Sequence, residues 1–198
     1  ELSGLTARTP NPEGGEVLKG ASGDPTGLLR ERASGLIRRG VGEPRPSEAE
    51  AEARNRKILE LASQEALSKG VTSFQDAGSS FATIDLMKKM VDEGKMGVRL
   101  WVMVRETNDR EAPRLKQYRM IDYGNGHLTV RAIKRAIDGA LGSRGAWLLE
   151  PYSDKPDSAG HNTTSVESIA ETARMAIEND SQLCVHAIGD RANRETLN

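Results

Sequence analysis

The two side chains in this sequence best suited to metal or proton chemistry are His186 and Lys134. His186 ends a short apolar run, residues 182–186, and Gly189 and Asp190 then open a helical pattern. In β/α folds, groups at the carboxyl end of a strand line the active site, and an imidazole there can ligate a metal or transfer protons. The alternative is a structural histidine that is held by hydrogen bonds.

Lys134 lies in the middle of the run 127–137, which predicts a strand. Alternation along a strand places Ala132 and Ala136 on the same side as Lys134, and these small neighbours leave room for its long side chain. A buried amine is costly unless it is paired or modified. Carbamylation would convert it into a carboxylate-like anion that can bridge two metal ions. The alternative is a lysine that pairs with Asp138 or lies on a solvated edge.

The segment that follows this strand, residues 138–145, is a glycine-rich loop. Its glycine spacing differs from the G-x-G-x-x-G fingerprint of dinucleotide-binding proteins, and it lacks the Lys-Ser/Thr pair of a P-loop. We therefore interpret it as a flexible loop that covers a substrate. Arg144, near its end, is suited to contact an anion or an amide.

Helical and strand patterns alternate along the chain and would position these residues. The spacing is that of parallel β/α units. Near the amino terminus, a turn-rich segment separates two short strands and predicts a hairpin. The predicted elements are a hairpin of 16–19 and 26–29, a stiff connector at 43–46, helices at 33–39, 47–70, 84–91 and 166–178, strands at 71–75, 98–104, 127–137 and 182–186, and a weakly helical connection at 111–120.

The longest predicted helix begins at a capping box, in which Ser47 and Glu50 satisfy each other's backbone N–H groups. Gly70 is suited to end it, because glycine readily adopts the left-handed conformation at a helix terminus. Residues at helical spacing predict a mostly apolar face. This face consists of Ile58, Leu61, Ala62, Glu65, Ala66 and Leu67.

The composition excludes several classes of protein. Among 198 residues, 28 Lys and Arg balance 29 Asp and Glu, so no basic field favours binding to nucleic acid. No apolar run approaches the ~20 residues of a membrane-spanning helix. With 36% hydrophobic and 4% aromatic residues, the core must be aliphatic. We expect neither a nucleic-acid nor a membrane partner.

Cys184 is the only cysteine, so no internal disulfide can form, and a reducing compartment such as the cytoplasm is favoured. Cys184 and His186 point to the same side of one strand, where neighbours rarely meet head-on, so a nucleophilic pair is disfavoured.

His127 and His161 are interpreted as surface residues. The chain begins without Met and ends in an opening helical turn, which we interpret as an internal piece of a longer protein.

Taken together, these segments resemble the amidohydrolase superfamily and, more narrowly, its amidohydrolase-3 group of YtcJ-like proteins. Four segments occur in the order of that family and span nearly the whole chain. They are Gly14-Gly15-Glu16-Val17 with Gly23-Asp24-Pro25-Thr26-Gly27-Leu28-Leu29, then Gly70-Val71-Thr72-Ser73, then Lys134 with Asp138 to Ala146 and Glu150 to Asp154, and finally Val185 to Ala192.

The resemblance implies an α/β fold, a partial (β/α)₈ TIM barrel of the metal-dependent hydrolase type. The chain would supply about half of the barrel, with a β-hairpin insertion near its amino terminus. Residues 1–46 would form the hairpin insertion and a connector, and residues 47–198 a partial barrel that is incomplete at both ends. Expressed alone, such a half barrel should aggregate or be only partly ordered, and it should be inactive, because its sheet edges are unpaired.

The resemblance also implies a metal site. Lys134 would be a carboxylated lysine that bridges the metal, and His186 would be the ligand from the fifth strand. One or two divalent ions, expected to be zinc, would bind there, while Asp138, Gly139 and Arg144 would flank the substrate. The family's His-x-His pair, its sixth-strand histidine and its eighth-strand aspartate would lie outside this chain, so no catalytic residue is assigned within it.

The function implied by the resemblance is that of a metal-dependent hydrolase. A metal-activated water would cleave the non-peptide C–N bond of a small-molecule amide, N-acyl or N-formyl compound. The alternative hypothesis is a non-catalytic β/α binding or structural module, in which Lys134 is salt-bridged and His186 is buried and neutral. Neither hypothesis assigns an oligomeric state.

Overall fold

The computed structural model of the protein describes residues 4–40 and 46–198. The chain forms two compact units, each built from segments far apart in the sequence. The division at residues 46 and 47 stays a prediction, and most of the predicted connector at 43–46 lies outside the described residues. Unit 1 comprises Glu1–Pro44, Ala136–Ile169 and Val185–Asn198, and unit 2 comprises Arg45–Arg135 and Ala170–Cys184.

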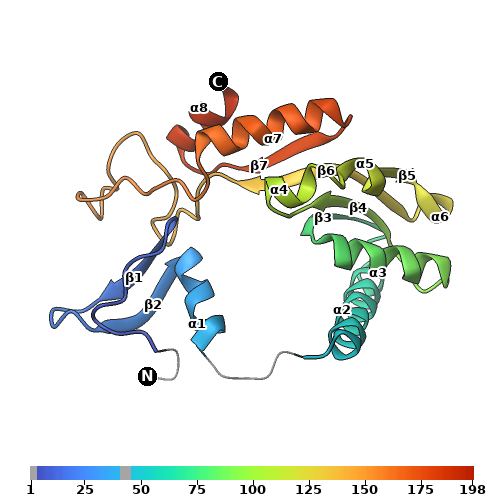
Figure 1. The fold of residues 1–198 in the computed structure, drawn as a ribbon, viewed down its shortest axis with the longest axis horizontal. Coiled ribbons are helices and arrows are strands. Elements are labelled where there is room, and N and C mark those ends of the chain that lie inside the picture. Colours follow the sequence, from blue (N-terminus) through green and yellow to red (C-terminus); the bar gives the residue numbers. More distant parts are fainter. Residues whose placement is uncertain (1–3, 41–45) are drawn as a thin grey trace. The chain divides into compact units, whose positions relative to one another are not determined.

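Unit 1 contains the predicted hairpin, which the structure confirms (Figure 1). Strand β1, Gly15–Lys19, pairs antiparallel with β2, Pro25–Glu31. The short helix expected after the hairpin is a 3₁₀ turn, Arg32–Ser34, followed by α1, Gly35–Gly40. Helix α8, Asp190–Leu197, also belongs to unit 1 and directly follows the segment that carries His186.

Helix α2 of unit 2, Glu48–Ser68, begins as predicted. The Ser47 hydroxyl accepts the Glu50 N–H at 3.3 Å, and the Ser47 N–H donates to Glu50 Oε2 at 2.8 Å, which confirms the capping box. Gly70 follows with a φ of 77°, a left-handed conformation that glycine adopts without strain. No helix within the described residues is both long enough and apolar enough to span a membrane.

The predicted apolar face of α2 is partly wrong. Ile58 and Leu61 are 52% and 51% exposed, whereas Leu59 packs against the core and Ser63 is buried. The reason is close packing beside Gly97, where an added Cβ would meet Leu67 Cδ1 at 2.7 Å and Ser63 Oγ at 3.2 Å. The lack of a side chain at Gly97 lets this side of α2 come close to the segment before β4 (Arg99–Val104), so packing outweighs the greater hydrophobicity of the other side.

The sheet of unit 2 consists of β3 (Ser73–Ser79), β4, β5 (Met120–Asp122), β6 (Leu128–Ala136) and β7 (Gln182–His186). The strand order is β3–β4–β6–β5, and β7 also pairs with β6. β3 with β4 and β4 with β6 run parallel, as the alternating pattern predicts. β5 is antiparallel to β6 and was not predicted, because its three residues are too few to show a strand period. The last residues of β6 and β7 are assigned to unit 1.

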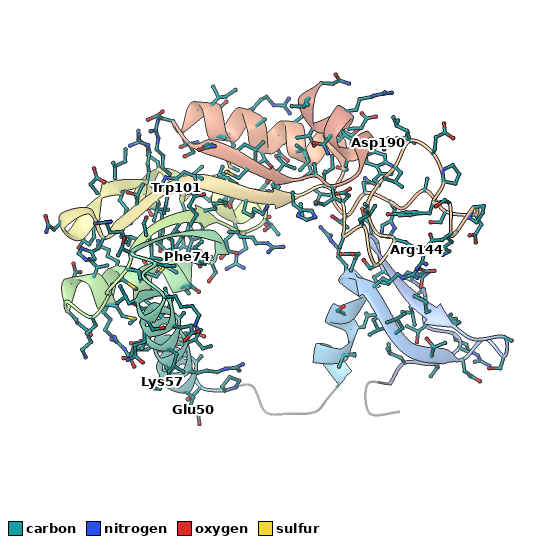
Figure 2. All side chains as sticks on the ribbon, turned by 180° about the vertical axis from the view of Figure 1, so that it is seen from behind. Glu50, Lys57, Phe74, Trp101, Arg144 and Asp190 are labelled. Carbon is teal, nitrogen blue, oxygen red and sulfur yellow. The ribbon has the colours of Figure 1, made fainter. Side chains whose placement is uncertain are left out.

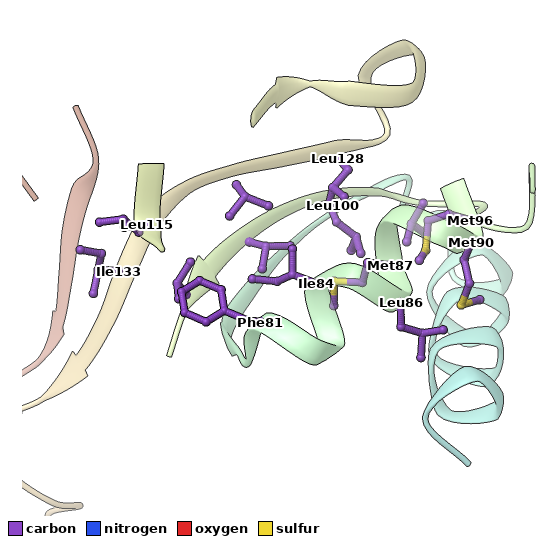
Figure 3. Packing of buried hydrophobic residues seen from close by; sticks show 14 of the residues in the cluster. Phe81, Ile84, Leu86, Met87, Met90, Met96, Leu100, Leu115, Leu128 and Ile133 are labelled. Atoms are coloured by element: carbon purple, nitrogen blue, oxygen red, sulfur yellow. The ribbon is translucent and has the colours of Figure 1, made fainter. Parts of the chain in front are cut away.

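The apolar core of unit 2 lies between this sheet and its helices (Figure 3). Helix α3, Phe81–Asp92, buries Ile84 and Met87 in this core. Helix α7, Val166–Glu178, has the predicted bounds, and its Met175 and Ala176 join the same cluster. Full burial of one such large side chain contributes about 1.5–3 kcal/mol, so apolar packing fixes the strands that lead to the candidate site. The connections contain the short helices α4 (Asn108–Glu111), α5 (Leu115–Tyr118) and α6 (Tyr123–Gly126).

Candidate metal and substrate site

Lys134 is a partly buried residue of β6, in unit 2. Burial lowers the pKa of its amine, the charge of Arg105 lowers it further, and Cys184 acts in the opposite direction. No carboxylate among the described residues of unit 2 influences this amine. Lys134 is therefore neutral at a lower pH than an exposed lysine, and a neutral amine is the form that can be carbamylated.

His186 is the last residue of β7 and belongs to unit 1. Its carbonyl oxygen accepts the Ile137 N–H at 3.0 Å, which ties the ends of β6 and β7 together. Its ring is partly buried, and no described residue of unit 1 forms a hydrogen bond with it. An imidazole nitrogen can ligate a metal ion or hydrogen-bond a substrate, and this role of His186 stays a prediction.

Asp138 lies just beyond the end of β6 and is only 2% exposed. Its Oδ2 accepts the Trp147 N–H at 2.9 Å and the Gly189 N–H at 2.8 Å, and its Oδ1 accepts the Ile188 N–H at 3.0 Å. Both carboxylate oxygens are therefore engaged with backbone. The role of Asp138 as a substrate contact stays a prediction, and the geometry points first to the backbone that it holds.

The glycine-rich loop, residues 138–145, is held by its own backbone and by Glu31, a residue that the sequence did not indicate. The Gly139 N–H donates to the Gly145 carbonyl at 3.1 Å, which closes the loop. Glu31, at the end of β2, accepts the Ala140 N–H at 3.4 Å and the Ser143 hydroxyl at 3.3 Å through Oε1. An added Cβ at Gly139 or Gly145 would collide with this carboxylate. The glycines thus make room for Glu31, a contact between distant segments that no local sequence signal announces.

Arg144 lies on the loop after β6, and Figure 2 shows it together with Asp190 at the start of α8. Its Nη2 donates to Asp154 Oδ2 at 2.6 Å and its Nε donates to Asp154 Oδ1 at 3.2 Å. This hydrogen-bonded pair raises the pKa of Arg144 and lowers the pKa of Asp154. The Asp154 side chain is 62% exposed, so a substrate that binds Arg144 would replace a partner in contact with solvent.

A polar cleft of about 570 Å³ in unit 1 lies between the segment around β1 and residues 155–165. Its volume is in the range of small-molecule sites. His161 lines it, but the Nε2 of this residue is buried and has no hydrogen-bond partner among the described residues. The prediction that His161 is a surface residue therefore fails for its ring, in which Nε2 is buried.

Arg135 interrupts the apolar pattern of β6, and the structure gives the reason. Its guanidinium pairs with the fully buried carboxylate of Glu111 and also donates to Asn108 Oδ1 at 2.7 Å. Burial raises the pKa of Glu111, and the charge of Arg135 opposes that effect. The pair lies in unit 2 and stabilises the strand that carries Lys134, rather than forming part of the candidate site.

The donor set for a metal ion is partial. Across residues 4–40 and 46–198, no three His, Cys, Asp or Glu side chains lie together as a metal site requires. Catalytic zinc takes three protein ligands and structural zinc takes four. An imidazole and a carbamylated lysine are groups that can ligate a metal ion, and the roles of His186, in unit 1, and Lys134, in unit 2, as such ligands stay predictions.

The α/β fold with its mixed sheet is shared with solved structures of metal-dependent hydrolases. The structure of an uncharacterized metal-dependent hydrolase from Pyrococcus horikoshii matches with a TM-score of 0.69 and 23% identity, over 99% of this chain and 37% of that chain. A corresponding structure from Pyrococcus furiosus matches with a TM-score of 0.68 and 25% identity, over 99% and 38%.

The chain belongs to the Amidohydrolase family, whose sequence model matches residues 1–198. It is 31% identical over 205 residues to "Putative amidohydrolase YtcJ" of Bacillus subtilis, which covers all of this chain and 36% of that protein. It is 30% identical over 203 residues to "Protein LONG AFTER FAR-RED 3" of Arabidopsis thaliana, which covers 98% of this chain and 34% of that protein. The chain thus spans about a third of the length of the curated relatives that it matches.

Proposed function

We propose that the protein is a metal-dependent amidohydrolase that cleaves a non-peptide C–N bond of a small-molecule amide, N-acyl or N-formyl compound. In this proposal the chain supplies about half of a (β/α)₈ barrel. Lys134 and His186 are ligands of one or two divalent ions, expected to be zinc. When bound, such an ion lowers the pKa of a water molecule and polarises the scissile carbonyl group. The family match over residues 1–198 supports this class of enzyme.

The observation that carries the proposal is the state of Lys134. Its amine is partly buried, its pKa is lowered by that burial, and unit 2 offers it no carboxylate within the described residues. A neutral amine attacks carbon dioxide with its lone pair: an N–C bond forms, one C=O π bond shifts onto oxygen, and a proton leaves the nitrogen. The product is a carbamate anion with oxygen donors of the kind that divalent cations accept. The environment of Lys134 therefore favours the modification that the proposal needs.

His186 and the loop after β6 have separate tasks in this proposal. The imidazole of His186 supplies a nitrogen ligand from the end of β7. Asp138, Gly139 and Arg144 flank the substrate. Of these, Arg144 is the group that can bind an anionic or amide oxygen, by exchanging the exposed carboxylate of Asp154 for the substrate.

The proposal is tested on protein expressed from its complete gene. The metal content is measured by inductively coupled plasma mass spectrometry, and hydrolysis is assayed with a panel of N-acyl and N-formyl amines. Carbon-13 bicarbonate in the buffer allows a lysine carbamate to be detected by NMR. We expect Lys134→Gln to lose the carbamate signal, the metal and the activity. Lys57→Gln changes a lysine of α2 whose side chain is 65% exposed, and it should keep all three.

The outcomes separate the parts of the proposal. A folded protein that binds no metal and hydrolyses no member of the panel would contradict it and favour the non-catalytic binding module. Metal and activity without a carbamate signal would contradict only the role of Lys134. Retention of full metal content in His186→Ala would contradict the role of His186.

A further inference from the structure

We propose that Asp138 is the positioning residue of His186: its buried carboxylate fixes the backbone turn that follows the imidazole. The inference rests on the proposed function only in taking His186 as a metal ligand. It gives Asp138 a task different from contact with the substrate, and the contacts that support it lie within unit 1.

The carboxylate of Asp138 is used entirely by backbone. It is 2% exposed and accepts three N–H groups, from Trp147, Ile188 and Gly189, at 2.8–3.0 Å. Hydrogen bonds to an ionised carboxylate are roughly twice as strong as those between neutral groups. These three N–H groups are the hydrogen-bond partners of the Asp138 carboxylate among the described residues of unit 1. Turning an oxygen toward a substrate would break at least one of these bonds.

These hydrogen bonds hold the turn after His186 from two directions. Ile137, just before Asp138, donates its N–H to the His186 carbonyl at 3.0 Å. Asp138 then receives the N–H groups of Ile188 and Gly189. Two consecutive residues just after β6 therefore bond to the backbone at and after His186, and these bonds restrict the direction of its side chain.

The same carboxylate joins the turn to the segment around Trp147. Trp147 donates its N–H to Asp138, and its carbonyl accepts the Ala192 N–H of α8 at 3.2 Å. Gly189 packs so closely against the Trp147 backbone that an added Cβ would collide with it. Asp138 thus lies where the end of β6, the exit of the glycine-rich loop and the start of α8 meet.

A metal ligand must be held in its orientation, and loss of such support costs about 10- to 100-fold in metal affinity. Asp138→Asn preserves the shape but replaces one acceptor oxygen with an NH₂ donor. At least one of the Trp147, Ile188 and Gly189 N–H groups would then face a donor. The turn should shift, and His186 should bind metal less tightly although its own side chain is unchanged.

The matched control is Asp190→Asn. Asp190 Oδ1 also accepts backbone N–H groups, those of Leu149 at 2.9 Å and Arg191 at 2.8 Å, but the side chain is exposed and does not bond to residues 187–189. Both variants are made in the protein expressed from its complete gene, and cobalt(II) is the probe, titrated by its visible absorption. We expect Asp138→Asn to weaken cobalt binding about 10- to 100-fold. Asp190→Asn should stay within about twofold of the wild type, because an amide oxygen can still accept the Leu149 N–H.

Hydrogen exchange of the amides provides a readout that requires neither metal nor variant. In the wild type, the Ile188 and Gly189 amides should exchange slowly. If they exchange as fast as exposed amides, the proposal is overturned even if Asp138→Asn does not fold. Unchanged cobalt affinity in a folded Asp138→Asn protein would also overturn it.

Failure of the proposed function gives a different pattern. If the wild type binds no cobalt, His186 is not a metal ligand, and the orientation of its ring is judged from its imidazole NMR signals. Asp138→Asn must then shift those signals while Asp190→Asn leaves them in place, and the absence of such a shift would refute the positioning role.

Discussion

The two units of the chain are stabilised in different ways. In unit 2, a continuous apolar cluster extends over α3, α7 and the strands. Among the described residues of this unit, Arg135 and Glu111 form the single buried ion pair. In unit 1, carboxylates bond to backbone: Asp138 holds three N–H groups, Glu31 holds the glycine-rich loop, and Asp190 holds Leu149.

This difference is one between two kinds of stabilisation. Apolar packing is non-directional and gives rigid strands, whereas a hydrogen bond to a carboxylate fixes one backbone position relative to another. The turn after His186, in unit 1, is held by bonds of the directional kind. The two tryptophans allow the comparison to be measured, because Trp101 lies in unit 2 and Trp147 in unit 1. Replacing either one by Phe leaves a fluorescent reporter of the other unit.

The largest effect is expected from Phe81→Ala in the core of unit 2. Phe81 is 1% exposed, its ring centroid is 4.3 Å from that of Tyr118, and the Arg114 guanidinium lies 4.4 Å above it. Truncation leaves a cavity and should lower the free energy of unfolding by about 3–5 kcal/mol. Urea unfolding followed by Trp101 fluorescence measures it. Ile177→Ala, at an 80% exposed site on α7, should change it by less than about 0.5 kcal/mol, and equal effects would contradict the assigned core.

Arg135→Met tests the one ionic element of that core. Loss of one partner from a buried pair should cost about 3–5 kcal/mol at neutral pH. Burial, which already raises the pKa of Glu111, would then be unopposed by Arg135. In the variant, Glu111 binds its proton more tightly in the folded state than in the unfolded state. The contribution of this proton to the free energy of unfolding is fully present below the unfolded pKa of about 4.3. It is lost as pH rises through the higher folded pKa.

Urea unfolding of Arg135→Met at several pH values measures this dependence. Adding Glu111→Gln removes the titrating group and should flatten the added pH dependence. A single variant whose stability follows the wild-type pH profile would show that Glu111 is not the group left without a partner.

The sequence predicts those parts of the fold whose signals are local. The helix Val166–Glu178 and the strand Gln182–His186 appear with the predicted bounds, and the capping box of Ser47 and Glu50 forms as expected. The side of α2 that packs inward was predicted less well. Ser63 is buried because it lies close to Gly97, and hydrophobicity does not predict this contact.

The candidate site is predictable only in its residue types. His186 and Lys134 stand out as chemical groups on predicted strands, but what surrounds them comes from distant segments. Arg135, on the strand that carries Lys134, bonds to Glu111, which is 24 positions away in the sequence. Glu31 accepts the N–H of Ala140, which is 109 positions away. No pattern within one helix or strand contains such pairings, because they depend on how the loops fold back on one another.

Gly139→Ala examines the carboxylate contacts of unit 1. An added Cβ would collide with the Glu31 carboxylate, so the substitution should cost about 1–3 kcal/mol by overpacking. Because the obstacle is that side chain, the cost should fall when Glu31→Ala is present. Urea unfolding followed by Trp147 fluorescence for the wild type, both single variants and the double variant gives the coupling, expected at about 0.5–3 kcal/mol. Additive effects would mean that Glu31 does not occupy the loop.

The smallest effect is expected from Ser47→Ala at the exposed start of α2. The substitution removes the hydroxyl that accepts the Glu50 N–H, so the free energy of unfolding should fall by about 1 kcal/mol. Ser68→Ala is the control at the other end of the helix, where the hydroxyl donates only to the Glu65 carbonyl. Because alanine has the higher helix propensity, this control should be neutral or slightly stabilising in the same Trp101 measurement. If Ser47→Ala matched the cost of Phe81→Ala, directional bonds would support unit 2 as strongly as its apolar cluster does, and the distinction between the two units would fail.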